Sequence, residues 1–194
     1  MNRRSGMTII ELSISMLLLV VVGFKVSLLL GMAAEAGEEN TSRIALEDQA
    51  MRLMDQVSFA VMGADRDTLF PDPDSPTYTD RVLYSVSLGV QDGEVVWGEP
   101  ETIEMSAADE QVVWRSQPGE PEERRVVWCN IVRPFLAGEI QNGIDDNGNG
   151  LIDESGLNFT LEGNTVQIRL TLERTNADGD RIDESVETRV TLRN

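Results

Sequence analysis

Residues 1–30 read MNRRSGMTIIELSISMLLLVVVGFKVSLLL and determine what the first part of the chain becomes. A short basic leader ends in Ser5-Gly6, and a long apolar run follows it. One acid, Glu11, interrupts that run five residues after the glycine. A carboxylate inside a membrane-spanning segment costs roughly 2.5–3.5 kcal/mol on insertion scales, so its presence calls for a functional explanation.

This stretch resembles the prepilin leader of type IV pilins and of the pseudopilins of type II secretion. Family members usually read Gly followed by FTLIE, and this chain reads Gly6 followed by MTIIE. The change to Met7 departs from the pattern at a position where the family's peptidase is permissive. The resemblance implies cleavage after Gly6 by a prepilin peptidase and methylation of the new terminus at Met7. It also implies that Glu11 pairs with the free amino group of Met7 on a neighbouring subunit during assembly.

An ordinary secretory signal is the alternative interpretation. Arg3 and Arg4 would form its basic region, and Ala34-Glu35-Ala36 its small-x-small cleavage site. The apolar region of a signal peptide normally runs about 7–15 residues, whereas this one is longer and contains Glu11. This alternative predicts a mature chain that begins at Gly37.

The charges flanking the apolar run predict its orientation. Arg3 and Arg4 favour a cytoplasmic N-terminal end by the positive-inside rule. About twenty residues span the hydrocarbon, which places the transmembrane part at about 7–28 and Lys25 at the outer interface. We therefore expect a single pass through the inner (cytoplasmic) membrane, with the C-terminal domain in the periplasm or outside the cell.

The composition limits the partners and the chemistry. The chain has 194 residues, a net charge of −18 and no histidine. This charge argues against nucleic acid and against acidic membrane surfaces as partners. Cys129 is the single cysteine, so no zinc set of His and Cys and no intrachain disulfide can form. Its apolar surroundings at 126–132 favour a buried thiol, and an intermolecular bridge is the alternative.

The helix is expected to continue beyond the membrane. No proline occurs before Pro71, and apolar residues recur at helical spacing after Gly37. We predict a near-continuous helix over 7–62, with Gly23 and Gly31 among the places where it could bend. The apolar stripe that should face a sheet consists of Leu46, Ala50, Leu53, Val57, Ala60 and Ala64.

The chain changes character at Gly63, and a proline-rich loop follows at 70–76. Short segments of strand composition come next, and 165–174 and 186–193 alternate apolar with polar residues. They predict an antiparallel sheet with one solvated face. The predicted strands are 81–88, 94–97, 102–105, 111–115, 125–132, 158–161, 165–174 and 186–193.

The expected fold class is therefore α+β. A long N-terminal transmembrane helix packed on an antiparallel β-sheet domain is similar to the pilin architecture. The expected parts are a leader at 1–6, the helix at 7–62 and the β domain at 63–194. Within the family, the domain most resembles the J-type minor pseudopilins and the W-type minor pilins.

A second chemical feature is the segment NGIDDNGNGLIDE at 142–154. Its oxygen-bearing side chains follow the spacing of an EF-hand-type loop, with a glycine for the sharp turn. Position twelve is Gly156 instead of the usual bidentate Glu. The sequence predicts a Ca²⁺ site here, and a polar turn without an ion is the alternative. The predicted ligands are Asp145, Asn147, Asn149, Leu151 through its carbonyl, Asp153 and Glu154.

A weaker copy of this pattern lies at 176–184, between the two final strands. Arg181 stands where the loop glycine belongs and would bring a positive charge toward a cation. Asp178-Gly179 between alternating strands already predicts a hairpin turn. We therefore interpret this segment as a turn.

No catalytic arrangement is recognisable, because the chain lacks a histidine base, a nucleophile elbow and a P-loop. We expect a non-enzymatic subunit at or near the tip of a type II secretion pseudopilus or a type IV pilus. The resemblance implies other pilin or pseudopilin subunits, the prepilin peptidase and the inner-membrane assembly platform as partners. The alternatives are an exported soluble calcium-binding domain and a membrane-anchored adhesin or sensor.

Overall fold

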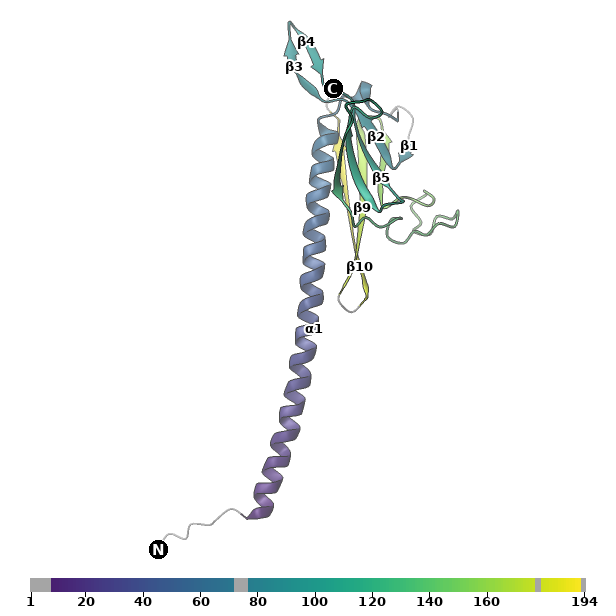
Figure 1. The fold of residues 1–194 in the computed structure, drawn as a ribbon. Coiled ribbons are helices and arrows are strands. Elements are labelled where there is room, and N and C mark those ends of the chain that lie inside the picture. The colour runs from purple at the N-terminus through teal and green to yellow at the C-terminus, as the bar shows by residue number, and fades with distance from the viewer. Residues whose placement is uncertain (1–7, 72–76, 177–178, 193–194) are drawn as a thin grey trace. The chain divides into compact units, whose positions relative to one another are not determined.

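The computed structural model describes residues 8–71, 77–176 and 179–192. The chain divides into two compact units, one that ends at Ser42 and one that begins at Arg43. Helix α1 (Ile9–Met62) contributes to both and is continuous over 54 residues (Figure 1). The predicted end at residue 62 is confirmed. The helix is also unbroken at Gly23 and Gly31, two of the places where it could bend.

The first unit contains the part of α1 that is long and apolar enough to cross a membrane. Every side chain from Ile9 to Met32 is exposed in the described chain. Burial of apolar surface is the dominant favourable contribution to folding, so a run of this kind needs a covering from outside the chain.

The second unit begins with the last turns of α1, and there the predicted stripe is confirmed. Leu46, Ala50, Leu53 and Val57 are at most 4% exposed, and Ala60 is partly buried. Ala64, the last predicted member, is also buried but lies just beyond the helix. This face packs into one core with the strands of the second unit.

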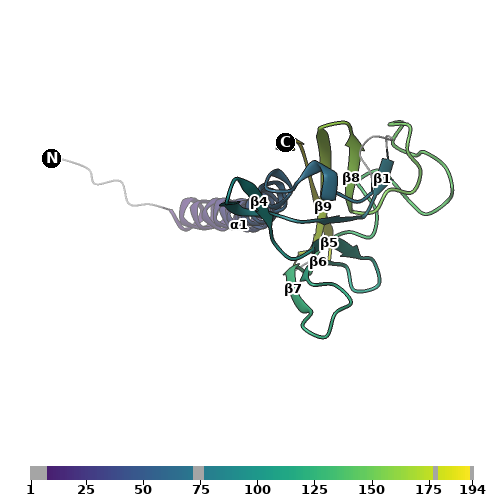
Figure 2. The ribbon, with the colours of Figure 1, turned by 90° about the horizontal axis from the view of Figure 1, so that it is seen from above.

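The strands form two four-stranded antiparallel sheets and one separate hairpin. Seen from above, β1 and β8 lie on one side of the unit, and β5, β6 and β7 on the other (Figure 2). A single 3₁₀ turn, η1 (Arg66–Thr68), lies between α1 and the strands. The first sheet has the order β1 (Thr77–Thr79), β8 (Leu157–Glu162), β9 (Thr165–Thr175), β10 (Arg181–Thr191). The second has the order β2 (Arg81–Tyr84), β5 (Glu101–Ser106), β6 (Gln111–Ser116), β7 (Arg124–Cys129), and the hairpin joins β3 (Ser87–Gln91) to β4 (Glu94–Trp97).

The strand predictions need four corrections. The strand expected at 125–132 ends at Cys129, and Val132 forms only an isolated bridge. The expected strand 81–88 is two strands, β2 and β3, which belong to different sheets. The short strand β1 was not predicted, because it directly follows the proline-rich loop. β10 begins at Arg181 and not at residue 186, since its pairing with β9 extends to Thr175↔Arg181.

The alternation predicted for β9 holds on its apolar side. Val166, Ile168, Leu170 and Leu172 are at most 1% exposed. On the opposite side Arg169 is partly exposed but Thr171 is fully buried, because the segment 131–137 crosses there. The peptide N–H of Ala137 donates to Thr171 Oγ1 at 3.1 Å. The second face of this sheet is therefore covered in part by the stretch that leads into the loop at 142–154.

Candidate functional sites

Glu11 closes the N-terminal end of α1. The peptide N–H of Thr8 donates to Glu11 Oε2 at 2.8 Å, and the Thr8 hydroxyl donates to the same oxygen at 3.1 Å. In return, the N–H of Glu11 donates to Thr8 Oγ1 at 3.3 Å. This reciprocal pair is a capping box, in which the side chains at the N-cap and at N3 satisfy each other's backbone donors.

The capping role was not predicted, although its signal is present in the sequence as Thr-x-x-Glu before an apolar run. It gives Glu11 an intrachain partner within the described residues. The predicted processing residues Gly6 and Met7 lie outside the described part of the chain. The pairing of Glu11 with an amino terminus therefore stays a prediction.

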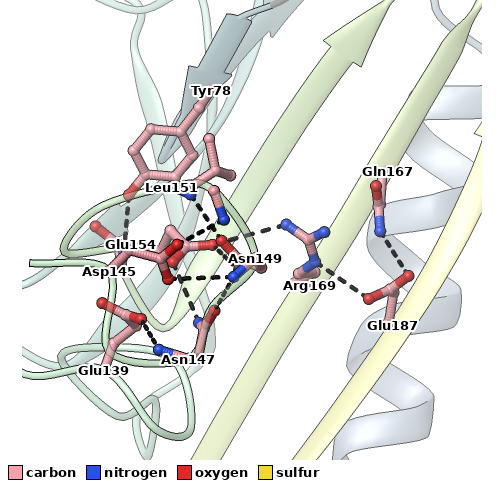
Figure 3. A network of polar contacts seen from close by, with 12 residues as sticks. Tyr78, Glu139, Asp145, Asn147, Asn149, Leu151, Glu154, Gln167, Arg169 and Glu187 are labelled. Carbon is pink, nitrogen blue, oxygen red and sulfur yellow. Dashed lines mark hydrogen bonds and ion pairs between the residues drawn. The ribbon is translucent and has the colours of Figure 1, made fainter.

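The predicted calcium loop lies between β7 and β8 and is closed by its own side chains (Figure 3). Asp145 Oδ1 accepts the N–H groups of Gly148 at 2.6 Å and Asn149 at 3.1 Å. Asp145 Oδ2 accepts the N–H of Gly150 at 2.7 Å. One carboxylate thus organises the tight turn, for which Gly148 and Gly150 supply positive φ angles of 75° and 90°.

The two predicted amide ligands converge on Glu154. Asn149 Nδ2 donates to Glu154 Oε1 at 2.6 Å, and Asn147 Nδ2 donates to Glu154 Oε2 at 3.3 Å. Their own Oδ1 atoms accept backbone N–H groups two residues further along, from Asn149 and from Leu151. The structure therefore brings Asn147, Asn149 and Glu154 together, with the two amide nitrogens donating to the carboxylate of Glu154. Their role as calcium ligands stays a prediction.

The side chain of Asp153 contacts the first residues of the segment 142–154. Its Oδ1 accepts the N–H groups of Asn142 at 3.0 Å and Gly143 at 3.1 Å. Its backbone φ of 51° is in the left-handed region, which is uncommon for a non-glycine residue. The described residues contain no group of three or more His, Cys, Asp or Glu side chains arranged to hold a metal. This absence says nothing for or against calcium, because amide and carbonyl oxygens make up half of the predicted ligands.

Glu139 is a residue of this site that the sequence interpretation missed. It is 0% exposed, and its Oε1 accepts the N–H of Asn147 at 2.9 Å. Its Oε2 is buried and has no hydrogen-bond partner. The available signal was an acid between Leu136-Ala137-Gly138 and Ile140, shortly before the loop.

A charged network connects the loop to the first sheet (Figure 3). Glu154 is also 0% exposed, and its Oε1 lies 3.7 Å from Arg169 Nη1 on β9. Arg169 Nε donates to Glu187 Oε2 on β10 at 3.1 Å. Burial of Glu154 is therefore balanced by a cation from a neighbouring strand, as a buried carboxylate requires.

The weaker copy of the loop is a hairpin turn, as predicted. The N–H of Asn176 donates to Asp180 O at 2.8 Å, and the N–H of Asp180 donates to Asn176 Oδ1 at 2.8 Å. β9 and β10 continue in register directly on either side. Asp178, the residue considered for a metal role, lies outside the described residues.

Cys129 is a buried free thiol, 4% exposed, at the end of β7. Gln49 of α1 donates through Nε2 to Cys129 Sγ at 3.8 Å. Burial raises the pKa of the Cys129 thiol, because the thiolate loses its hydration. The interpretation as a buried, small apolar side chain is confirmed.

An apolar groove of about 420 Å³ lies between the end of α1 and the second sheet. Trp114 and Trp128 stack at its wall, with ring centroids 6.4 Å apart. Glu101 Oε2 accepts hydrogen bonds from Tyr84 Oη at 3.0 Å and Trp114 Nε1 at 2.9 Å. Burial, and secondly the Glu101 carboxylate, raise the pKa of Tyr84, so this phenol stays a donor. Phe59 is exposed at the rim.

Comparison with known protein families, with curated proteins and with solved structures found no match to this chain.

Proposed function

We propose that this chain is a minor subunit of a type II secretion pseudopilus or a type IV pilus, located at or near the filament tip. One observation carries the proposal. A single continuous helix exposes every side chain from Ile9 to Met32 and then buries an apolar stripe from Leu46 onward. The first part suits a membrane before assembly and neighbouring helices after it, while the second part fixes the helix to its own β unit.

The β unit offers further apolar surface for contact with other subunits. Leu88 and Val90 on β3 are 71% and 70% exposed, and Trp97 on β4 is also exposed. Val126 and Val127 on β7 are exposed as well. Single exposed apolar residues are ordinary, but adjacent ones on a hairpin and on an edge strand favour a surface that is covered in an assembly.

The proposed role needs no catalysis. Its partners are other pilin or pseudopilin subunits, the prepilin peptidase that cuts after Gly6, and the inner-membrane assembly platform. The proposed location is the inner membrane, with the β unit in the periplasm or outside the cell. Resemblance to J-type minor pseudopilins or W-type minor pilins is the narrower form of the same proposal.

Glu11 has two roles in this account, and the chain offers variants that separate them. Glu11→Gln removes the charge but keeps a side chain that can complete the capping box with Thr8. Thr8→Ala keeps the charge and removes the N-cap hydroxyl, at a cost of about 0.5–2 kcal/mol to the helix end. Glu11→Val removes both.

The experiment compares these variants for membrane insertion and for recovery in filaments sheared from cells or co-purified with sister subunits. All three should insert, because the two Glu11 variants remove an acid from the apolar run and Thr8→Ala leaves the charges of that run unchanged. Glu11→Gln and Glu11→Val should be lost from filaments, and Thr8→Ala should be retained. Normal incorporation of Glu11→Gln would show that the charge has no role in assembly.

A further inference from the structure

We propose that Glu139, which lies outside the loop pattern, completes a calcium site with the loop 145–153. The EF-hand-type pattern lacks its acidic twelfth residue, since that position is Gly156. Glu139 supplies the missing carboxylate from the N-terminal side of the loop. The other contributing residues are Asp145, Asn147, Asn149, Leu151 through its carbonyl, and Asp153.

The first observation is the unpartnered oxygen of Glu139. The side chain is 0% exposed and points at Asn147 of the loop, where its Oε1 accepts the backbone N–H (Figure 3). Its Oε2 is buried without a hydrogen-bond partner. A buried carboxylate oxygen without a partner is costly, and native structures nearly always supply a donor or a cation. A bound cation accounts for this oxygen.

The second observation is the charge of the segment. Residues 139–154 contain five acids, Glu139, Asp145, Asp146, Asp153 and Glu154, and no lysine or arginine. Among the described residues, Arg169 is the one cation that forms an ion pair with this segment, and it faces Glu154 and Glu187. The charges of Glu139, Asp145 and Asp153 thus have no cationic side chain opposite them in the described part of the chain.

The third observation is that the backbone holds Glu139 against the loop. The N–H of Glu139 donates to Leu136 O at 3.0 Å, and the N–H of Leu136 donates to Glu154 O at 2.9 Å. Gly138 has a φ of 87°, and a Cβ atom there would lie 3.3 Å from Asn147 Cβ. The positive φ favours glycine at this position, and the close approach brings the next residue, Glu139, beside the loop.

Glu154 has a different role from the one that the pattern assigned to it. Both of its oxygens already accept side-chain amide hydrogen bonds, from Asn147 and Asn149, and Arg169 balances its charge. It therefore positions the two amides, while Glu139 retains an oxygen that is free to bind. Asp145 and Asp153 also accept hydrogen bonds, but only from backbone N–H groups, and no cation faces them among the described residues. With Glu139, the two amide groups and the Leu151 carbonyl they supply six oxygen-bearing groups, and Ca²⁺ takes about 6–8 oxygen ligands.

The experiment titrates CaCl₂ into the full chain in detergent micelles by calorimetry and records melting in calcium and in chelator. Glu139→Gln keeps an acceptor for the N–H of Asn147 but removes the charge. Glu162→Gln, an exposed acid on β8, is the matched control. We expect Glu139→Gln to weaken calcium binding about tenfold or more, and Glu162→Gln to leave it unchanged.

Melting distinguishes a ligand from a structural residue. In chelator, Glu139→Gln should melt at or above the wild-type temperature, because it removes a buried, half-partnered charge. In millimolar calcium the order should reverse, since only the wild type gains the stabilisation of binding. A lower melting temperature of Glu139→Gln by the same amount in both conditions would identify Glu139 as a structural residue and overturn the inference.

Two further outcomes keep the test decisive. If Glu139→Gln fails to fold, Glu139→Asp keeps the charge with a shorter reach, and equal calcium affinity of this variant and the wild type would overturn the inference. Absence of calcium binding by the wild-type chain would refute the proposed calcium site. None of these results depends on the filament proposal, which is tested at Glu11.

Discussion

The two parts of α1 share one helix but differ in what covers them. From Ile9 to Met32 all side chains are exposed, whereas Leu46, Ala50, Leu53 and Val57 are buried against the strands of their own unit. Backbone hydrogen bonds are the same in both parts, so secondary structure does not explain the difference. The pattern of the side chains explains the difference, because the first part is apolar on every side and the second part is apolar only along one stripe.

This difference shows that one continuous helix can contain two side-chain patterns that need different surroundings. An all-round apolar run needs a covering that surrounds it, which a membrane or a bundle of neighbouring helices provides. A single stripe needs only one partner surface, and the strands of the second unit provide it. The apolar run ends near Met32 and the buried stripe begins at Leu46, and the boundary between the two units, Ser42–Arg43, falls between them.

The largest expected effect comes from shortening a buried side chain in the second part. Leu53→Ala should lower the free energy of unfolding of the β unit by about 2–5 kcal/mol, because it leaves a cavity in the core. Leu28→Ala, an exposed position in the first part, should leave it unchanged. Denaturant unfolding of the full chain in detergent, followed by tryptophan fluorescence, measures both. Equal losses would contradict the division of the helix.

A positive charge introduced into each part of α1 tests which part enters the membrane. Leu18→Arg should cost roughly 2.5–3.5 kcal/mol of insertion, because it puts a cation near the centre of the span. Met51→Arg, on the exposed face of the second part, should insert normally and fold normally. The fraction of each variant that resists alkaline extraction from membranes is the readout. Unaltered extraction resistance of Leu18→Arg would argue against a membrane span.

The smallest effect concerns Cys129, which reports whether α1 stays packed on the sheet. Its pKa is raised by burial, so less thiolate is present at neutral pH than for a free cysteine. Alkylation of the native chain should be slow at pH 7 and should accelerate only as the pH rises above the usual thiol range. Gln49→Ala should speed it modestly, since Gln49 contacts the sulfur. Mass-spectrometric labelling rates at several pH values measure this.

The local sequence pattern predicted the positions of the helix and the strands better than it predicted which strands pair with each other. The end of α1 at Met62 and the hairpin of β9 and β10 follow from spacing and from turn residues that lie close together in the sequence. The division of the strands into two sheets does not, because it depends on pairings such as β1 with β8 across about eighty residues. The break between β2 and β3 is a further example, since 81–88 reads as one apolar stretch.

The candidate sites show the same limit. The loop at 142–154 was predicted from its internal spacing, and the side-chain hydrogen bonds of Asp145 and Asn149 indeed lie within the segment. Glu139 and Arg169 were not predicted, because their contacts with the loop arise from tertiary packing. The capping box of Thr8 and Glu11 was predictable but was overlooked, since the acid was interpreted only as a group for assembly.

The mass of the N-terminal peptide tests the central claim most directly. Chain purified from the membranes of cells that carry a prepilin peptidase should begin with N-methylated Met7 and should still contain the apolar run. This result would place the exposed part of α1 in the mature protein, as a filament subunit requires. A mature terminus at Gly37 would contradict the account, because the exposed part would then be a cleaved export signal and the protein a soluble one.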